Sequence, residues 1–122
     1  MSTNTYTNAK VKLRGTQTIY TAPTAGTSII KSIRVTNTDE NTDRTVSLFI
    51  TDTSSVDFYV ELNRTIQKKS SQEILAAGNL DQNSADSSVS SPTPLILKSS
   101  EVLKATTTGS DIELVASILE MT

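Results

Sequence analysis

Residues 16–53 read TQTIYTAPTAGTSIIKSIRVTNTDENTDRTVSLFITDT and decide the fold class. A short strand over 17–21 ends in a turn, where Pro23 has no N–H to donate to a sheet. Two longer strands with alternating apolar residues follow at 27–37 and 45–51, and a loop rich in Asp, Asn and Thr separates them. This rhythm predicts an antiparallel β-sandwich.

Similar segments elsewhere in the sequence predict further strands, about eight in total. The expected fold is an all-β antiparallel sandwich that is either jelly-roll-like or Ig-like. The further strands are expected at 11–13, 58–62, 95–97, 102–105 and 112–118. Residues 1–10 are polar and predict an extended N-terminal arm, which leaves 11–122 as a single domain. The Ser- and Asp-rich stretch 79–94 is expected to be its long loop.

Alternation also assigns side chains to faces of the strands. Ile29, Ile33 and Val35 are expected to point inward together, and Phe49 is expected to point outward. Residues 57–62 alternate most cleanly and predict a half-buried strand. The last strand has apolar residues on both faces: Ile112, Leu114, Ala116 and Ile118 on one, and Val115, Leu119 and Met121 on the other. Its second face is therefore a candidate contact with a neighbouring subunit.

Composition excludes several kinds of chemistry. The 122 residues contain no His and no Cys, which removes disulfides, thiolate nucleophiles, imidazole bases and the usual zinc ligands. The absence of disulfides favours assembly in a cytosolic environment. The net charge of −2 does not favour nucleic acid as a partner. No apolar run approaches the roughly 20 residues of a membrane span, and the polar start predicts no signal peptide.

Three weak candidates for a chemical site remain. Residues 39–43 begin with the spacing of a calcium loop, but Arg44 and Ile50 stand where that loop requires Gly and Glu. A calcium-dependent carbohydrate-binding module is therefore an alternative, although aromatic residues for a sugar platform make up only 4% of the chain. The carboxylates Asp52, Asp57 and Glu61, or the serines beside Lys98 and Lys104, are the remaining enzymatic candidates, and no base accompanies them at a recognisable spacing. We expect no enzymatic activity, metal or cofactor.

The order of several short segments resembles one family. TIYTAP at 18–23, GT at 26–27 and IKSIRVTN at 30–37 resemble the start of small β-sandwich structural proteins of tailed bacteriophages, many from marine or cyanobacterial hosts. PLIL at 94–97, EVLKA at 101–105 and ASILE at 116–120 continue the resemblance. These motifs are structural, and they cover roughly residues 16–122 in order.

The resemblance implies a virion structural protein that is not an enzyme and is assembled in the host cytoplasm. It favours a capsid decoration or cement protein that binds the major capsid protein and self-associates, a trimer being one option. A neck, tail or fibre-attachment protein is the alternative.

The candidate interface combines the arm with large or charged side chains expected on outer strand faces. These residues are Tyr6, Lys10, Lys12, Arg14, Tyr20, Phe49 and Tyr59. Lys10, Lys12 and Arg14 alternate along one strand face, which is typical either of a docking patch for an acidic partner or of a solvated, charge-protected edge.

Overall fold

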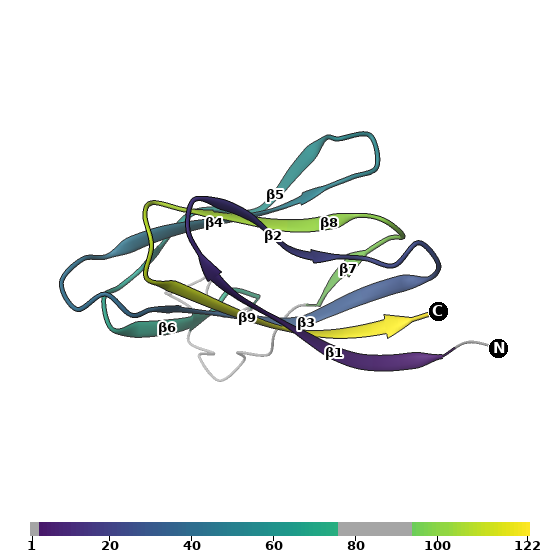
Figure 1. The fold of residues 1–122 in the computed structure, drawn as a ribbon, viewed down its shortest axis with the longest axis horizontal. Helices are drawn as coiled ribbons and strands as arrows, with labels where there is room; N and C mark the ends of the chain where they lie inside the picture. The colour runs from purple at the N-terminus through teal and green to yellow at the C-terminus, as the bar shows by residue number, and fades with distance from the viewer. Residues whose placement is uncertain (1–2, 76–93) are drawn as a thin grey trace, which may run out of the picture.

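The computed structural model describes residues 3–75 and 94–122, which form nine strands in two antiparallel sheets (Figure 1). The strands are β1 (Asn4–Leu13), β2 (Thr16–Thr21), β3 (Thr27–Asn37), β4 (Arg44–Thr51), β5 (Asp57–Ile66), β6 (Ser70–Glu73), β7 (Leu95–Leu97), β8 (Val102–Thr107) and β9 (Ile112–Met121). The predicted all-β antiparallel sandwich is confirmed. The described part of the chain contains no helix long and apolar enough to cross a membrane.

The strand order identifies the type of sandwich. The first sheet runs β1-β9-β3-β6, with β7 also paired to β3, and the second sheet runs β2-β8-β4-β5. Strands therefore pair from the two ends of the chain inward, as β1 with β9, β2 with β8, β3 with β6 and β4 with β5. A long antiparallel hairpin rolled into two layers gives this pattern, which is the jelly roll rather than the Ig-like arrangement.

The core lies between the inward faces of the two sheets. Ile33 and Val35 from β3 and Leu114 from β9 are fully buried in the first sheet, and Leu48 and Leu103 are fully buried in the second. The alternation predicted for the last strand is confirmed, because its four inward residues are all buried. Val115, on the opposite face of the same strand, is 43% exposed.

A β-bulge changes the face assignment in β3. The register with β9 shifts between Ile30 and Ser32, so that Ile30, rather than Ile29, is buried beside Ile33. The prediction that Ile29 points inward is wrong. A bulge inserts one extra residue, here Lys31, and a strict period of two misassigns every residue on one side of it.

The N-terminal residues form a sheet strand rather than the expected extended arm. Strand β1 begins at Asn4 and pairs with β9 along its whole length, and Thr3 exchanges two backbone hydrogen bonds with Thr122, of 2.8 and 2.9 Å. Backbone pairing with β9 orders this polar segment, and polar composition does not reveal such pairing.

The clean alternation in β5 does not produce a buried face. Phe58, Tyr59 and Leu62 are 56%, 55% and 63% exposed, and within residues 57–62 only Val60 packs against the core. Two register shifts interrupt the pairing of β5 with β4, and β5 is the outer strand of its sheet. Bulges increase the local twist of a strand, and Figure 1 shows the β4–β5 hairpin leaning away from the other layer. The expected loop at 79–94 lies outside the described residues, apart from Pro94.

Two neighbouring residues of β9 test the position of the core. Leu114→Ala should lower the free energy of unfolding by about 2–5 kcal/mol, because it leaves a cavity at a fully buried position. Val115→Ala should change it by only about 0.5 kcal/mol. Urea denaturation of both variants measures the difference, and equal losses would contradict the orientation of β9.

Two glycines in turns test the contact between β3 and the end of β9. Both have positive φ, +65° at Gly15 and +96° at Gly26, but a Cβ at Gly26 would lie 2.1 Å from the carbonyl oxygen of Met121. Gly15→Ala should lower the free energy of unfolding by about 1–2 kcal/mol, because its backbone conformation strains an L-residue. Gly26→Ala should lower the free energy of unfolding by clearly more, because the new Cβ also collides with the Met121 carbonyl. Thermal unfolding of the two variants checks this ranking, and a Gly26→Ala protein as stable as Gly15→Ala would contradict it.

Candidate functional site

The predicted interface residues do not gather on one surface. Tyr6, Lys10 and Lys12 project from the outer face of β1 in the first sheet, and Arg14 lies in the β1–β2 turn. The other three, Tyr20, Phe49 and Tyr59, belong to β2, β4 and β5 of the second sheet. The structure therefore separates Tyr6 and the charged candidates from the other three aromatic candidates.

Tyr20 points between the sheets rather than outward. Its hydroxyl donates to the carboxylate of Glu120 and lies 2.9 Å from Oγ of Ser28, so it links β2 to both β9 and β3. Burial, followed by the hydrogen bond to Glu120, raises the pKa of Tyr20 to about 12. The expectation that Tyr20 is an exposed contact residue is wrong, because its ring packs against the core and its hydroxyl joins the two layers.

Phe49 points away from the core, as predicted, but it is only 6% exposed. The ring of Tyr59 lies over it, with centroids 5.2 Å apart and planes tilted by 39°. Phe49 is therefore not available to a partner, whereas Tyr59 is 55% exposed and is available.

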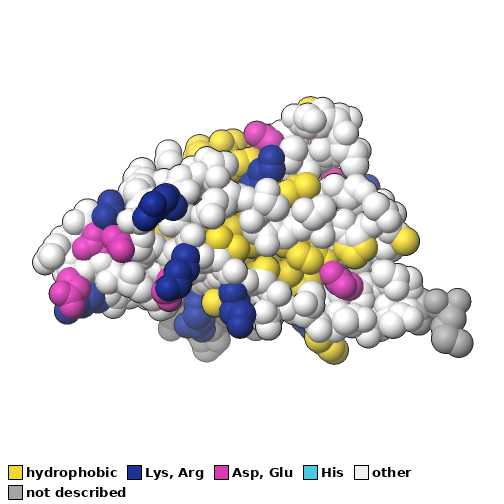
Figure 2. All heavy atoms as spheres, viewed as in Figure 1, with side chains coloured by type: hydrophobic (Ala, Val, Ile, Leu, Met, Phe, Trp, Pro, Cys, Tyr) yellow, Lys and Arg dark blue, Asp and Glu magenta, His cyan; other side chains and the backbone are white. Residues whose placement is uncertain are grey.

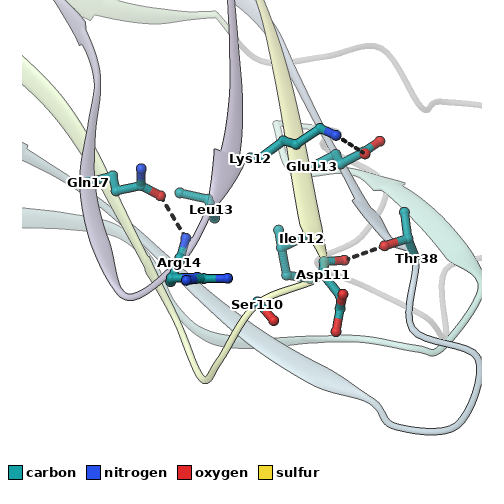
Figure 3. Close-up of a pocket in the computed structure, with 9 residues that line it drawn as sticks. All are labelled: Lys12, Leu13, Arg14, Gln17, Thr38, Ser110, Asp111, Ile112 and Glu113. Atoms are coloured by element: carbon teal, nitrogen blue, oxygen red, sulfur yellow. Dashed lines mark hydrogen bonds and ion pairs between the residues drawn. The ribbon is translucent and has the colours of Figure 1, made fainter.

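Lys12 and Arg14 border a cleft of about 500 Å³ at the end of the sandwich that holds the β1–β2 turn (Figure 3). Lys12 lies 3.9 Å from Glu113, and the backbone N–H of Arg14 donates to Gln17 at 2.6 Å. Ser110 contributes the only serine hydroxyl of the lining. The charges in the cleft are of both signs, and the lining offers no base to activate that hydroxyl except a carboxylate or Lys12.

The loop that resembles a calcium site is closed by an arginine. Arg44 Nη2 lies 2.9 Å from Asp39 and 3.5 Å from Asp111, and its Nη1 donates to the carbonyl of Thr108 at 3.0 Å. The backbone N–H of Asn41, and then Arg44, hold the pKa of Asp39 below its ordinary value. Arg44 thus supplies the positive charge between the carboxylates. Within residues 3–75 and 94–122, no three metal-ligating side chains come together.

The carboxylates considered for catalysis are engaged locally. Asp52 accepts the N–H groups of Ser54 and Val56, which closes the turn of the β4–β5 hairpin. Asp57 accepts the hydroxyl of Thr51 at 2.7 Å, and Glu61 lies 3.5 Å from Arg64. These contacts are typical of hairpin structure rather than of an acid–base pair.

An apolar surface that residue-by-residue reading missed crosses the first sheet. Tyr6 is opposite Leu119, Leu119 is opposite Ile29, and Ile29 is opposite Ile96, so the four residues form one row over β1, β9, β3 and β7. We call this set the outer apolar row. Tyr6 and Ile96 are 75% and 58% exposed. Leu119 was placed on this face by its alternation, but Ile29 joins it only because of the bulge.

A second group of exposed apolar side chains belongs to the β4–β5 hairpin. Val56, Phe58, Tyr59 and Leu62, which we call the β5 patch, are 47–63% exposed. Of the predicted interface residues, only Tyr59 belongs to it. The signal in the sequence for these residues is the clean alternation of 57–62, which predicts a half-buried strand rather than an exposed group.

Comparisons with known proteins concern the fold. Neither protein-family models nor curated protein sequences match the chain. The solved structure of VP2 of infectious bursal disease virus, as a subviral particle, superposes with a TM-score of 0.52 at 10% identity, over 98% of this chain and 32% of VP2. A pentameric capsid protein from metagenomic phage sequences gives a TM-score of 0.48 at 16% identity, over 94% of this chain and 61% of that protein. The chain therefore shares its fold with about a third of VP2.

The Tyr20 contact predicts a pH dependence of stability. The unfolded phenol releases its proton near pH 10, and the folded one near pH 12, so the stabilisation is complete below pH 10 and is lost as the pH rises to 12. Tyr20→Phe should therefore lose less stability across this window than the wild type. Urea unfolding at several pH values measures the slope of the free energy of unfolding against pH for the wild type and for Tyr20→Phe.

Tyr6→Phe serves as the matched control, because the Tyr6 ring is 75% exposed, and it should keep the wild-type slope. A Tyr20→Phe protein with the wild-type slope would contradict the assignment.

Proposed function

We propose that this chain is a non-enzymatic structural protein of a virion. The observation that carries the proposal is the jelly-roll strand order, which extends over the described chain and superposes on VP2 across 98% of the sequence. Jelly rolls recur in viral capsid proteins and in lectins. Fold alone does not assign a function, so the choice between these classes depends on the surface.

The surface favours a structural role over the binding of sugars. Within the described residues, the loop that would hold calcium is neutralised by Arg44, and Phe49, the most enclosed aromatic side chain of the second sheet, lies beneath Tyr59. The exposed apolar side chains instead lie in the outer apolar row and the β5 patch. Such patches are typical of contacts between proteins.

Within this class, we propose a capsid decoration or cement protein that binds the major capsid protein and self-associates. The order of short motifs shared with small phage β-sandwich proteins supports a virion structural role, and a neck, tail or fibre-attachment protein is the alternative. Lys10, Lys12 and Arg14 on or beside the exposed face of β1 are then candidate contacts to acidic surfaces of the capsid.

Measuring the copy number of the chain in purified particles tests this function. Quantitative mass spectrometry of gradient-purified virions should find it at a copy number of the same order as the major capsid protein. A host cytosolic protein followed through the same gradient controls for contamination. A copy number that is a small fraction of that of the major capsid protein would indicate a neck or tail protein instead. Absence of the chain from intact virions would overturn the proposal.

A further inference from the structure

The two apolar surfaces carry opposite charge. The β5 patch belongs to the same hairpin as Asp52, Asp57 and Glu61, and of these three carboxylates only Glu61 forms an ion pair, with Arg64, in the part of the chain that the structure describes. Asp52 and Asp57 are engaged only by hydrogen bonds from neutral groups, so their negative charge is not compensated by an ion pair within the described residues. The hairpin is thus an apolar surface with an acidic border.

The outer apolar row has a basic border. Lys10 is opposite Val115, which is in turn opposite Arg34, and Lys31 projects from the bulge of β3. Within the described residues, none of these three cations forms an ion pair. Figure 2 shows Lys and Arg side chains over the first sheet, close to exposed hydrophobic atoms.

Two carboxylates share this face without reversing its charge. Glu113 lies 3.9 Å from Lys12, and Glu73 accepts the backbone N–H of Ile33 at 2.7 Å. The face therefore keeps an excess of positive charge next to its apolar row.

The two surfaces cannot cover each other within one molecule. The outer apolar row lies on the outside of the first sheet, whereas β5 is the outer strand of the second sheet and leans away from the first (Figure 1). A partner must supply the complementary surface, and a second copy of the chain carries it.

We propose that the β5 patch of one copy packs on the outer apolar row of the next copy. This inference rests on the self-association included in the proposed function and names its surfaces. Apolar area is removed from water on both sides, and Asp52 and Asp57 meet Lys10, Lys31 and Arg34 at the rim. The contact also covers β5, whose outer edge has no strand beside it in the described fold.

Charge selects this arrangement over a symmetric one. Two β5 patches packed on each other place the Asp52 and Asp57 carboxylates of both copies at the same contact, and like charges held close together repel. Two copies joined through their outer apolar rows likewise place Lys31 and Arg34 of one copy next to Lys31 and Arg34 of the other, and these positive charges repel. Association is therefore head to tail, and each copy uses one surface of each kind, which leads to a closed ring or an open chain.

Two variants, each lacking one surface, separate this arrangement from every symmetric one. The hairpin variant carries Phe58→Ser and Leu62→Ser, and the face variant carries Ile96→Ser and Arg34→Glu. All four side chains belong to or border exposed surfaces, and urea unfolding should confirm that both proteins remain folded. Lys68→Glu, an exposed charge change in the β5–β6 connection, is the matched control.

Sedimentation velocity over a range of concentrations should show the wild type and Lys68→Glu assembling alike. Each double variant alone should self-associate at least about tenfold more weakly, a loss of about 1.4 kcal/mol or more. An equimolar mixture of the two variants should form 1:1 heterodimers and nothing larger, because it retains one intact hairpin and one intact face per pair. Native mass spectrometry with one isotope-labelled partner identifies these heterodimers.

A wild type that stays monomeric, a double variant that assembles like the wild type, or a mixture without heterodimers would each overturn the inference. Its failure is distinct from failure of the proposed function. A chain present in virions without head-to-tail association would refute only the surfaces, whereas head-to-tail assembly of a chain absent from virions would refute only the virion role.

Discussion

The pairing of β9 with both β1 and β3 is the contact on which the rest of the molecule depends. The last strand of the chain lies between two strands from its first third, and it supplies four of the fully or almost fully buried side chains of the core. Because β1 pairs with no strand of the first sheet except β9, it has no place in that sheet until β9 has paired with β3. Folding of this sheet therefore waits for contacts between the two ends of the sequence, which are slow to form.

Polar contacts fix how the two layers and their loops meet. At one end, the hydroxyl of Tyr20 joins the second sheet to Ser28 and Glu120 of the first. At the other, the buried amide of Asn37 donates to the carbonyls of Thr42 and Ile66, each at 3.0 Å. Buried polar groups need such partners, and these contacts specify one relative position of the sheets.

This construction leaves the side chains that distinguish the protein on its outside. The charged residues that sequence motifs offered for catalysis or calcium binding close hairpins and loops instead, as Asp52 and Arg44 do. The apolar residues that a small sandwich has no room to bury, such as Leu62 and Ile96, remain on two surfaces of opposite charge. The head-to-tail association proposed above uses one surface of each kind.

The sequence by itself determined the class of fold and most strand positions, because the alternation of side chains is a local property of each strand. It also determined the inward face of β9 and the poverty of reactive groups. Only the tertiary structure decided that the sandwich is a jelly roll, that residues 4–10 form an edge strand, that Ile29 faces outward, and that Tyr20 joins the layers while Tyr59 covers Phe49. The reason is that pairing partners, bulges and the position of an edge depend on residues far apart in the chain, so no local pattern records them.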